Sequence, residues 1–332
     1  MSNGLSFRHS GDLGDAIYAL SVMSEIHGSH TLRCVNRPGI TGEFLKRVPL
    51  LIDLLESQNY IKKVECSEEH VECDFVPFRR HHGSTTTLVR AQAVEIGWVG
   101  GTGADPWLKV KPSKVARGRI IIARSPRYNN IEFPWKEIVA HYGERLLFVG
   151  LQEEYDKFCA FFGRVEQRKV KNFLELAELI AGSELFIGNQ SSPMAIAMGL
   201  GHNVIQEVCI EQPDCIYKRD NVVYYANGEM TLPDVGGSGT HFVKERRDDH
   251  SKISRAIVPS GGWKYRGLPD CDHFQVQKRL VMKVENCDDS TADEKLLEYN
   301  YDRVMKFYHG TAGSKLLPFE TAYNNAFSGH LV

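Results

Sequence analysis

The sequence has 332 residues, of which 42% are hydrophobic and 25% are charged, and these proportions exclude a wholly disordered or fibrous protein. A chain of this length can bury a large core and is long enough for two domains of ordinary size. The formal net charge of -2 gives no overall basic field for nucleic acid, so only local basic patches, at 79–82 and 244–247, remain as contact points of that kind.

The start of the chain lacks the pattern of a secretory signal, and no apolar run approaches the roughly 20 residues that span a bilayer. We therefore expect a cytoplasmic protein without a transmembrane segment. The eight cysteines are scattered without a Cys-x-x-Cys pair, which indicates neither a zinc site nor a disulfide framework. We expect reduced thiols that are mostly buried as small apolar groups.

The first hundred residues alternate short apolar segments with helical patterns. Leu5 to Arg8 is predicted to be a buried strand, and from Asp15 onward the apolar spacing is that of a helix. The stretch between them, "HSGDLGD", is therefore a loop from strand to helix. Further strands are predicted at 31–35, 61–66 and 74–78, and a further helix at 43–56. Strands that alternate with helices favour a parallel sheet.

A basic stretch at 109–119, "KVKPSKVARGR", has the proline, glycine and low apolar content of a linker. We place the boundary there, between a Rossmann-like domain at 1–112 and a second one at 117–235. Strands of the second domain are predicted at 119–123, 146–150, 185–188 and 203–208. Helices are predicted at 135–142, 155–162, 172–182 and from Ser192 onward. Strands this apolar are typical of a sheet that is covered on both faces.

From Gly236 the pattern changes, and residues 236–332 are predicted to be a C-terminal extension with a loop rich in glycine and charge. A closing helix is predicted at 291–308, begun by the capping box Thr291-x-x-Glu294. Asp270-Cys271-Asp272 is an Asp-x-Asp string of the kind that can hold a divalent ion, but it lies outside the repeated strand-helix pattern. We therefore expect no metal site.

A polar loop follows the strand at 185–188, at the strand end where an open parallel sheet binds its ligands. Its residues Asn189, Gln190, Ser191 and Ser192 have small hydrogen-bonding side chains, and a proline occupies the first helical turn just before Met194. Exposed N–H groups and the helix dipole favour an anion there, and a diphosphate is the anion that we expect. The alternative is an ordinary helix cap.

Two other loops supply charge to the same edge of the sheet. Arg124 and Arg127 follow the strand at 119–123 and can neutralise a diphosphate through their planar guanidinium groups, although a solvated surface loop is the alternative. Glu153 or Glu154 follows the strand at 146–150 and can accept bonds from ribose hydroxyls, or else only complements a helix dipole. Three separate loops thus predict one anionic, hydroxyl-rich ligand.

Two parts of the sequence resemble the heptosyltransferase-like glycosyltransferases of family 9. "GDAIYALSVM" resembles the N-terminal motif of that family, and "FVGLQEEYDKF" followed by "NFLELAELIAGSELFIGNQSSPMAIAMGLGHNVIQEV" resembles its C-terminal half. The resemblance covers the opening motif and about residues 120–210. It implies an α/β fold of the GT-B type, in which two Rossmann-like domains face each other across a cleft. It also implies a nucleotide-diphosphate sugar as co-substrate, with no other cofactor.

By this resemblance Asp15 falls on the proposed catalytic aspartate of the family, Glu154 on the glutamate that binds the ribose, and Arg127 near a basic residue that binds phosphate. Residues 191–194 occupy the turn that holds the donor phosphates. The sequence departs from the family pattern at Asn189-Gln190, at Ala195 and at Ser21.

The opening loop would then face the donor. Gly11 and Gly14 would let the backbone approach a ligand closely or adopt a positive φ. Asp15 would take the proton of an acceptor hydroxyl as it attacks the anomeric carbon, with inversion, and Asp12 and His9 are alternative bases or orienting partners. The other interpretation is that both aspartates only cap a helix, whose dipole would lower their pKa and weaken them as bases.

The function predicted from the sequence is a metal-independent, inverting transfer of sugar from a nucleotide-diphosphate sugar to an acceptor hydroxyl. One alternative is an epimerase or hydrolase of the same fold, which would turn over the donor without an acceptor. Another is a non-catalytic module that binds a nucleotide sugar or glycan. The acceptor can be a glycan, a lipid-linked sugar, a protein or a modified nucleic-acid base, and the sequence does not choose among them.

Overall fold

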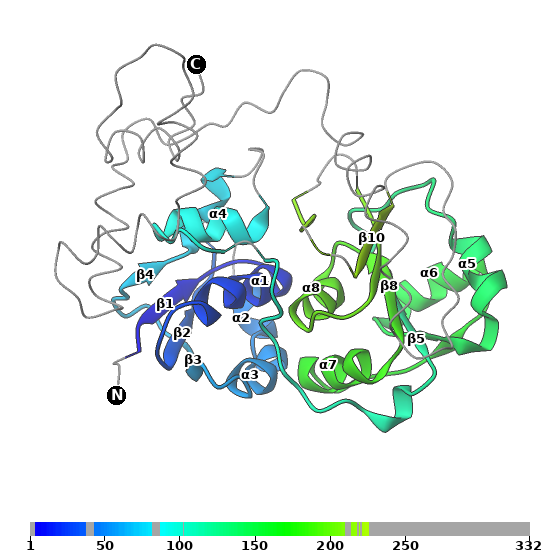
Figure 1. Ribbon diagram of the computed structural model, residues 1–332, viewed down its shortest axis with the longest axis horizontal. Helices are drawn as coiled ribbons and strands as arrows, with labels where there is room; N and C mark the ends of the chain where they lie inside the picture. The colour runs from blue at the N-terminus through cyan, green and yellow to red at the C-terminus, as the bar shows by residue number, and fades with distance from the viewer. Residues whose placement is uncertain are drawn as a thin grey trace, which may run out of the picture.

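The computed structural model describes residues 4–37, 43–81, 87–101, 103–209, 214–217, 219 and 221–225. These residues form two α/β units that lie side by side, each built on a parallel sheet (Figure 1). The predicted α/β class with two Rossmann-like units is therefore confirmed. The predicted closing helix, the Asp-x-Asp string and the rest of the extension lie outside the described residues, as does the basic patch at 244–247.

The first unit contains a parallel sheet of four strands in the order β3-β2-β1-β4. The strands are β1 (Ser6–His9), β2 (His30–Cys34), β3 (Ile61–Cys66) and β4 (Cys73–Asp74). The helices are α1 (Leu13–Ser24), α2 (Glu43–Arg47), α3 (Pro49–Glu56), the 3-10 helix η1 (Val76–His81) and α4 (Leu88–Glu95).

Three features of this unit differ from the prediction, each for a local reason. The helix predicted at 43–56 is divided into α2 and α3, and Pro49 begins the second of them. The strand predicted at 74–78 ends at Asp74, because Pro77 lacks the N–H that a sheet needs and the chain turns into η1 instead. Helix α4 was not predicted, since its buried residues surround the helix and leave no clear apolar stripe.

One face of the first sheet carries charged side chains rather than helices. In the described chain, residues 67–72 connect β3 to β4 without a helix, so the crossover that would cover this face is missing. Arg8 of β1 forms an ion pair with Asp74, its register partner on β4. Arg33 of β2 pairs in the same way with Glu65 on β3, at 2.9 Å. Cross-strand pairs of opposite charge stabilise such a face modestly.

The second unit contains a parallel sheet of six strands in the order β10-β9-β8-β5-β6-β7. The strands are β5 (Ile120–Ala123), β6 (Leu146–Phe148), β7 (Glu166–Gln167), β8 (Leu185–Asn189), β9 (Val204–Glu207) and β10 (Val222–Tyr225). The helices are α5 (Trp135–Tyr142), α6 (Gln152–Phe162), α7 (Phe173–Gly182), α8 (Ser192–Gly199) and the 3-10 helices η2 (Lys114–Ala116) and η3 (Gly143–Arg145).

Each strand and helix predicted between 119 and 208 is present, and the sequence explains why. Asn172 caps α7 by accepting a hydrogen bond from the N–H of Glu175 at 3.0 Å, and α7 ends at Gly182 as predicted. Strands β5, β8 and β9 are buried at every position, as expected for a sheet covered on both faces. Strands β7 and β10 were not predicted; β7 has only two residues.

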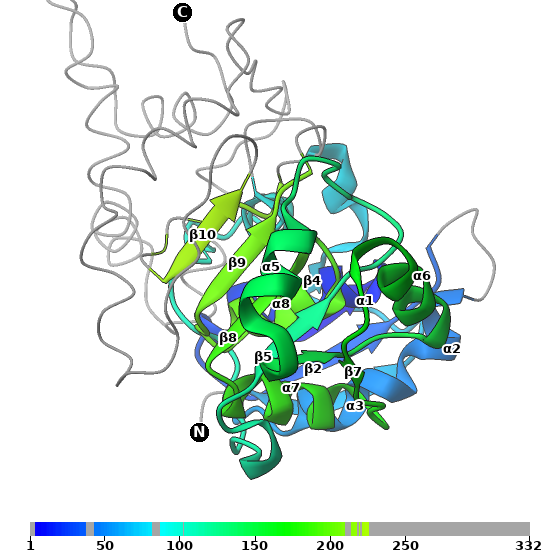
Figure 2. The ribbon, with the colours of Figure 1, turned by 90° about the vertical axis from the view of Figure 1, so that its right-hand side faces the viewer.

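Helices cover both faces of the second sheet, and one of these faces joins the first unit. Helices α5 and α6 pack on one face around Trp135 and Phe158, and Figure 2 shows α5 across that face. Helices α7 and α8 cover the other face, where their apolar residues belong to the same continuous core as those of α1 and β1. Helices α1 and α8 lie against each other between the two sheets (Figure 1).

The strand orders place a ligand site where α1 meets α8. In each sheet the order reverses beside its first strand, between β1 and β4 and between β5 and β8. Ligands of open α/β sheets bind at such reversal points, beyond the carboxyl ends of the strands. Here the two reversal points belong to units that share one core, so their loops meet.

None of the described helices combines the length and the apolar character that crossing a bilayer requires. Four of the described cysteines, Cys34, Cys73, Cys209 and Cys215, are buried free thiols, Cys159 is half-buried and Cys66 is exposed.

Candidate active site

A polar pocket of about 180 Å³ lies between the two units, at the carboxyl ends of both sheets. The first unit contributes the loops after β1 and β2, helix α1, η1 and the start of α4, and the second unit contributes the loops after β5, β8 and β9. The lining residues are Asp12, Gly14, Asp15, Tyr18, Arg37, Arg79, Leu88, Arg127, Tyr128, Gln190, Ser191, Ser192, Asp214 and Cys215.

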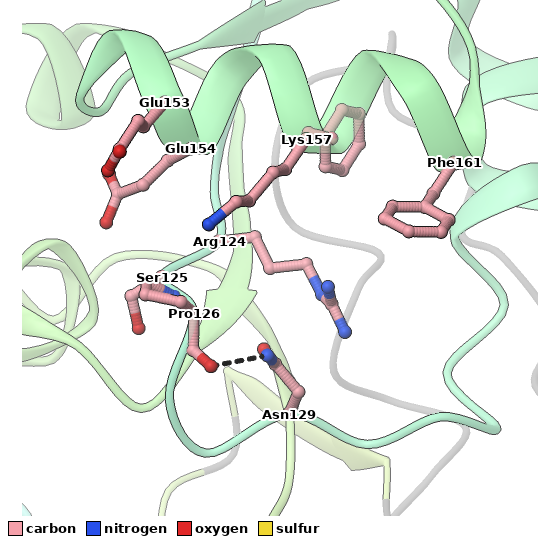
Figure 3. Close-up of a pocket in the computed structure, with 9 residues that line it drawn as sticks. Arg124, Ser125, Pro126, Asn129, Glu153, Glu154, Lys157 and Phe161 are labelled. Atoms are coloured by element: carbon pink, nitrogen blue, oxygen red, sulfur yellow. Dashed lines mark hydrogen bonds between the residues drawn. The ribbon is translucent and has the colours of Figure 1, made fainter.

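A second pocket of about 220 Å³ lies within the second unit, between α6 and the loop after β5. Figure 3 shows Glu153, Glu154, Lys157 and Phe161 along the side of α6 that faces this loop, which carries Arg124 to Asn129. The same loop also carries Arg127 and Tyr128, which line the first pocket. One loop thus forms a wall of both pockets, so a ligand in one pocket lies near the other.

The structure divides the residues predicted from the sequence into three groups. Asp12, Gly14, Asp15, Arg127, Gln190, Ser191 and Ser192 line the pocket between the units. Arg124, Glu153 and Glu154 line the second pocket. His9, Gly11, Asn189 and Met194 line neither of the two, and their places in the core or behind the loops are described below.

The carboxylate of Asp15 is held at the wall of the pocket by two donors. Its Oδ2 accepts the backbone N–H of Asp12 at 3.0 Å and also forms an ion pair with the guanidinium of Arg79. The side chain is 15% exposed, so it is largely removed from water and still reaches the pocket. The bond to Asp12 is the helix-capping contact that the sequence offered as an alternative role, and the same carboxylate also faces the cavity.

Burial raises the pKa of Asp15 above its usual value, and the Arg79 guanidinium and the Asp12 N–H only partly offset this effect. The direction is opposite to that expected for a carboxylate that merely caps a helix. A carboxylate with a raised pKa is a stronger base, which suits proton abstraction near neutral pH.

His9 does not reach the pocket, because it ends β1 in the core and is fully buried. Its ring packs against Phe78 with 5.7 Å between centroids, and its Nδ1 accepts the backbone N–H of Gly11 at 2.9 Å. Burial, with a smaller effect of nearby Arg79, lowers the pKa of His9 to about 3. This placement argues against His9 as a base and favours a role in fixing the loop after β1.

Neither glycine of the opening loop adopts a positive φ, and only Gly11 lies where a Cβ would clash. A Cβ on Gly11 would lie 2.7 Å from the Cβ of Asp15 and would displace that side chain. A Cβ on Gly14 would lie 3.6 Å from the Cα of Ser192, so the first turn of α1 meets the first turn of α8 at this residue. Gly11 therefore fixes the Asp15 side chain from behind the pocket, and Gly14 lies in the pocket wall where the two helices meet.

The N-terminus of α8 is open toward the pocket. Ser191 occupies the N-cap position, but its side chain makes no capping bond, and its hydroxyl donates instead to the carbonyl of Asn189 at 3.1 Å. The first turn of α8 holds no acidic residue. Met194 is fully buried in the core and presents only its backbone here. Such a helix end attracts an anion through its N–H groups and its dipole.

Arg127 and Asp12 face each other across the pocket, 3.5 Å apart. Both side chains are well exposed, at 62% and 45%, so this pair adds little stability. An exposed guanidinium in a weak pair is available to a phosphate that enters the pocket.

The guanidinium of Arg124 binds a buried carboxylate of the protein. Its guanidinium donates to both oxygens of Glu207, a fully buried carboxylate at the end of β9. Glu207 also accepts the backbone N–H of Asn130 at 2.7 Å and the indole N–H of Trp135 at 2.9 Å. Two of the three guanidinium nitrogens of Arg124 are thus engaged by Glu207, and its contact with a diphosphate stays a prediction.

Asn189 and Glu207 together hold the loop after β5 in place. The buried side chain of Asn189 accepts the N–H of Ser125 at 3.0 Å and donates to the carbonyl of Ser125 at 3.1 Å. At the tip of this loop Tyr128 adopts a φ of 57°, which is unfavourable for a residue with a Cβ. The anchors on both sides of Tyr128 maintain this strained conformation between the two pockets.

Glu154 lies half-buried at the start of α6, where it accepts the N–H of Leu151 at 2.8 Å. Burial raises the pKa of its carboxyl. Glu153 beside it is exposed. Glu154 thus caps the start of α6 and also lines the second pocket.

Sequence reasoning missed several pocket residues. Arg79 was noted only within a basic patch, although its position just after a strand was a usable signal. Glu207 was visible as a charge that ends an apolar strand. No sequence signal singled out Asp214 and Cys215.

The basic patch at 79–82 does not form a free cationic surface in the described chain. Arg79 pairs with Asp15, and Arg80 donates to both oxygens of Glu95 at 2.7 and 2.8 Å. His81 lies 3.1 Å from the same Glu95 carboxylate. Among the residues that the structure describes, no three His, Cys, Asp or Glu side chains are grouped so as to hold a metal ion.

Comparison with known proteins gives similarities in structure only. No protein-family model matches the sequence, and no curated protein matches it. Several solved structures are similar.

One is the E. coli heptosyltransferase WaaC with ADP-2-deoxy-2-fluoro heptose, at a TM-score of 0.42 and 11% identity over 66% of this chain and 92% of that one. Another is the glycosyl transferase family 9 protein from Veillonella parvula DSM 2008, at a TM-score of 0.44 and 13% identity over 86% and 99%. A third is the E. coli ADP-heptose LPS heptosyltransferase II, at a TM-score of 0.44 and 9% identity over 68% and 91%. These values are too low for any residue role or substrate to be transferred to this chain.

The Glu207 cluster predicts a large loss of stability when one partner is removed. In Glu207→Leu the guanidinium of Arg124 loses its buried counter-charge, and the free energy of unfolding should fall by about 3–5 kcal/mol. The double variant Arg124→Met/Glu207→Leu removes both charges and should recover much of this loss. Urea denaturation measures both, and a double variant no more stable than Glu207→Leu would contradict the assignment.

The buried neutral His9 predicts a loss of stability in acid. Its pKa is about 3 in the folded chain and near 6.5 when unfolded, so the unfolded state binds more protons as the pH falls from about 6.5 toward 3. In His9→Gln the side-chain oxygen can still accept the Gly11 N–H, but it does not titrate. The slope of unfolding free energy against pH between 6 and 4 should therefore fall by up to about 1.4 kcal/mol per pH unit.

Urea denaturation at several pH values measures this slope. The wild-type chain is the reference and should keep the His9 contribution. An unchanged slope in His9→Gln would show that His9 is not the buried neutral group.

Proposed function

We propose that this protein transfers a sugar from a nucleotide-diphosphate sugar to an acceptor hydroxyl, with inversion at the anomeric carbon and without a metal ion. The observation that carries the proposal is that Asp15, a carboxylate whose pKa is raised by burial, shares one pocket with the open N-terminus of α8. A base and an anion site on opposite units are what a transfer between two substrates requires.

In the proposed reaction the acceptor oxygen attacks the anomeric carbon, and its proton passes to the carboxylate of Asp15. The bond from the anomeric carbon to the phosphate oxygen breaks, and the nucleoside diphosphate leaves with the electron pair. A single displacement of this kind inverts the anomeric centre.

The second unit would hold the leaving group. The diphosphate would lie at the first turn of α8, beside the exposed guanidinium of Arg127, and both would stabilise the charge that develops on it. The ribose and base would occupy the second pocket, where the carboxylates of Glu153 and Glu154 can accept hydrogen bonds from sugar hydroxyls.

The role of Asp15 predicts a separation of binding from turnover. Asp15→Asn removes the base but keeps the shape, so turnover should fall by about 10²- to 10⁴-fold while ligand-induced thermal stabilisation remains. A panel of UDP, GDP, ADP, CMP and dTDP sugars, including ADP-heptose, identifies the donor by its rise in Tm. Turnover is then followed by release of the nucleotide.

Two controls sharpen this test. Asp12→Asn tests the neighbouring carboxylate, and Asp156→Asn, on the exposed surface of α6, should match the wild type. Full turnover in Asp15→Asn, or no stabilisation by any member of the panel, would refute the proposal. Release of nucleotide without an acceptor would favour a hydrolase.

The open helix end predicts a variant that keeps the fold and loses the donor. Aspartate is as good an N-cap as serine, so Ser191→Asp should change the free energy of unfolding by less than about 1 kcal/mol. Its negative charge would repel the diphosphate, and the Kd for the nucleotide sugar should rise at least about tenfold. Calorimetric titration checks the affinity. Ser191→Asn, an equally good cap without charge, should bind as the wild type does, and equal affinities for both variants would exclude this phosphate site.

A further inference from the structure

The Asp15 carboxylate is anchored through one oxygen only. Oδ2 accepts both the Asp12 N–H at 3.0 Å and the guanidinium of Arg79. No hydrogen bond to Oδ1 is made by the part of the chain that the structure describes. A carboxylate held in this way has one oxygen fixed and the other available to a substrate.

Arg79 also makes a contact that is independent of Asp15. Its guanidinium carbon lies 4.5 Å from the centroid of the Phe78 ring, and Phe78 is fully buried against His9. Its Nη1 is buried and has no hydrogen-bond partner among the described residues, so the contact with Asp15 uses a single nitrogen. A guanidinium that bound both carboxylate oxygens would leave neither of them available to accept a proton. The contact through one nitrogen leaves Oδ1 available.

We propose that Arg79 is a positioning residue for the transfer: it holds Oδ2 of Asp15 so that Oδ1 meets the acceptor hydroxyl. The inference rests on the proposed role of Asp15 as the base. Arg79 itself need not touch either substrate, because it acts through the carboxylate that it orients.

The charges around Asp15 single out Arg79 for this role. Burial raises the pKa of Asp15, Arg79 is the strongest influence that lowers it, and the more distant Arg127 adds a smaller lowering effect. The backbone N–H of Asp12 also lowers this pKa, the carboxylate charge of Asp12 raises it, and His9 behind the loop is neutral. The other titratable groups that line the pocket are Arg37, Tyr18, Tyr128, Asp214 and Cys215.

These other groups do not substitute for Arg79. Burial raises the pKa of Tyr18 and of Cys215 well above their usual values, and burial also raises the pKa of Tyr128, so all three are uncharged near neutral pH. Asp214 is an acid and cannot stabilise a second carboxylate. Arg37 is exposed and makes no ion pair with Asp15 in the described chain.

The competing role for Arg79 is direct binding of an anionic acceptor. Loss of such a contact would raise the KM for the acceptor and leave the pH dependence unchanged. Loss of the positioning contact would instead raise the pKa of Asp15. Because the base must be ionised to act, the acid limb of kcat/KM would then move to higher pH.

The experiment compares Arg79→Gln, Arg79→Lys and the control Arg80→Gln. Arg80 lies on the same 3-10 helix, but it pairs with Glu95 and does not line the pocket. Two quantities are measured, the pH profile of kcat/KM and the titration of the Asp15 carboxyl by ¹³C NMR, with the resonance assigned by its absence in Asp15→Asn. The NMR titration uses the ligand-free protein and needs no substrate.

In Arg79→Gln we expect both titrations to move up by about one to three pH units, the usual effect of a close opposite charge. Arg79→Lys should restore most of this shift, because the positive charge is retained, while its rate stays below that of the wild type because the ammonium orients the carboxylate less well. Arg80→Gln should titrate as the wild type does.

Unshifted titrations in Arg79→Gln, or a change in acceptor KM alone, would overturn the role of Arg79. If Arg79→Gln does not fold, Arg79→Lys decides: a rate equal to the wild type would overturn the orienting role. Full turnover in Asp15→Asn would refute the proposed function itself, whatever the NMR titration shows, so the two failures are distinguishable.

Discussion

The packing of α1 against α8 is the contact on which the rest of the site depends. Gly14 brings the first turns of the two helices together, and each helix follows the strand at which its sheet reverses order. The carboxyl ends of both sheets are thereby directed at one pocket. A side chain larger than that of alanine at this point would separate the loops that carry Asp15 and Ser191, and neither unit alone contains both the proposed base and the proposed phosphate site.

The two helix ends that meet there are electrically unequal. The start of α1 is already compensated by Asp12 and Asp15, whereas the first turn of α8 carries no acidic residue and no side-chain cap. A shared pocket thus has a carboxylate side and a side that lacks negative charge. In the proposed reaction this asymmetry would give the donor one orientation, with its phosphates toward the second unit and its reactive end toward the first.

Local sequence signals predicted much of the fold, and long-range contacts decided the rest. Apolar strands and the Asn172 cap identified β5, β6, β8 and β9 and the helices between them, because these signals lie within a few residues of one another. The charged partner of Arg124 could not be predicted, since Glu207 is distant in sequence and reaches it only through the strand order. The same is true of Asp15: its place at the start of a helix was visible, but the raised pKa depends on burial between two units. The ion pair of Asp15 with Arg79 depends on a turn that the sequence suggested as a strand.

The apolar core does not stop at the linker, since α1 and β1 of the first unit and α7 and α8 of the second belong to one cluster. The second unit also has a cluster of its own around Trp135 and Phe158, but the larger cluster belongs to both units. The two units should then unfold together in a single cooperative event. A rigid rotation of one unit about a hinge would expose apolar surface to water. Substrates would enter through rearranged loops around the pocket, with the two sheets remaining fixed relative to each other.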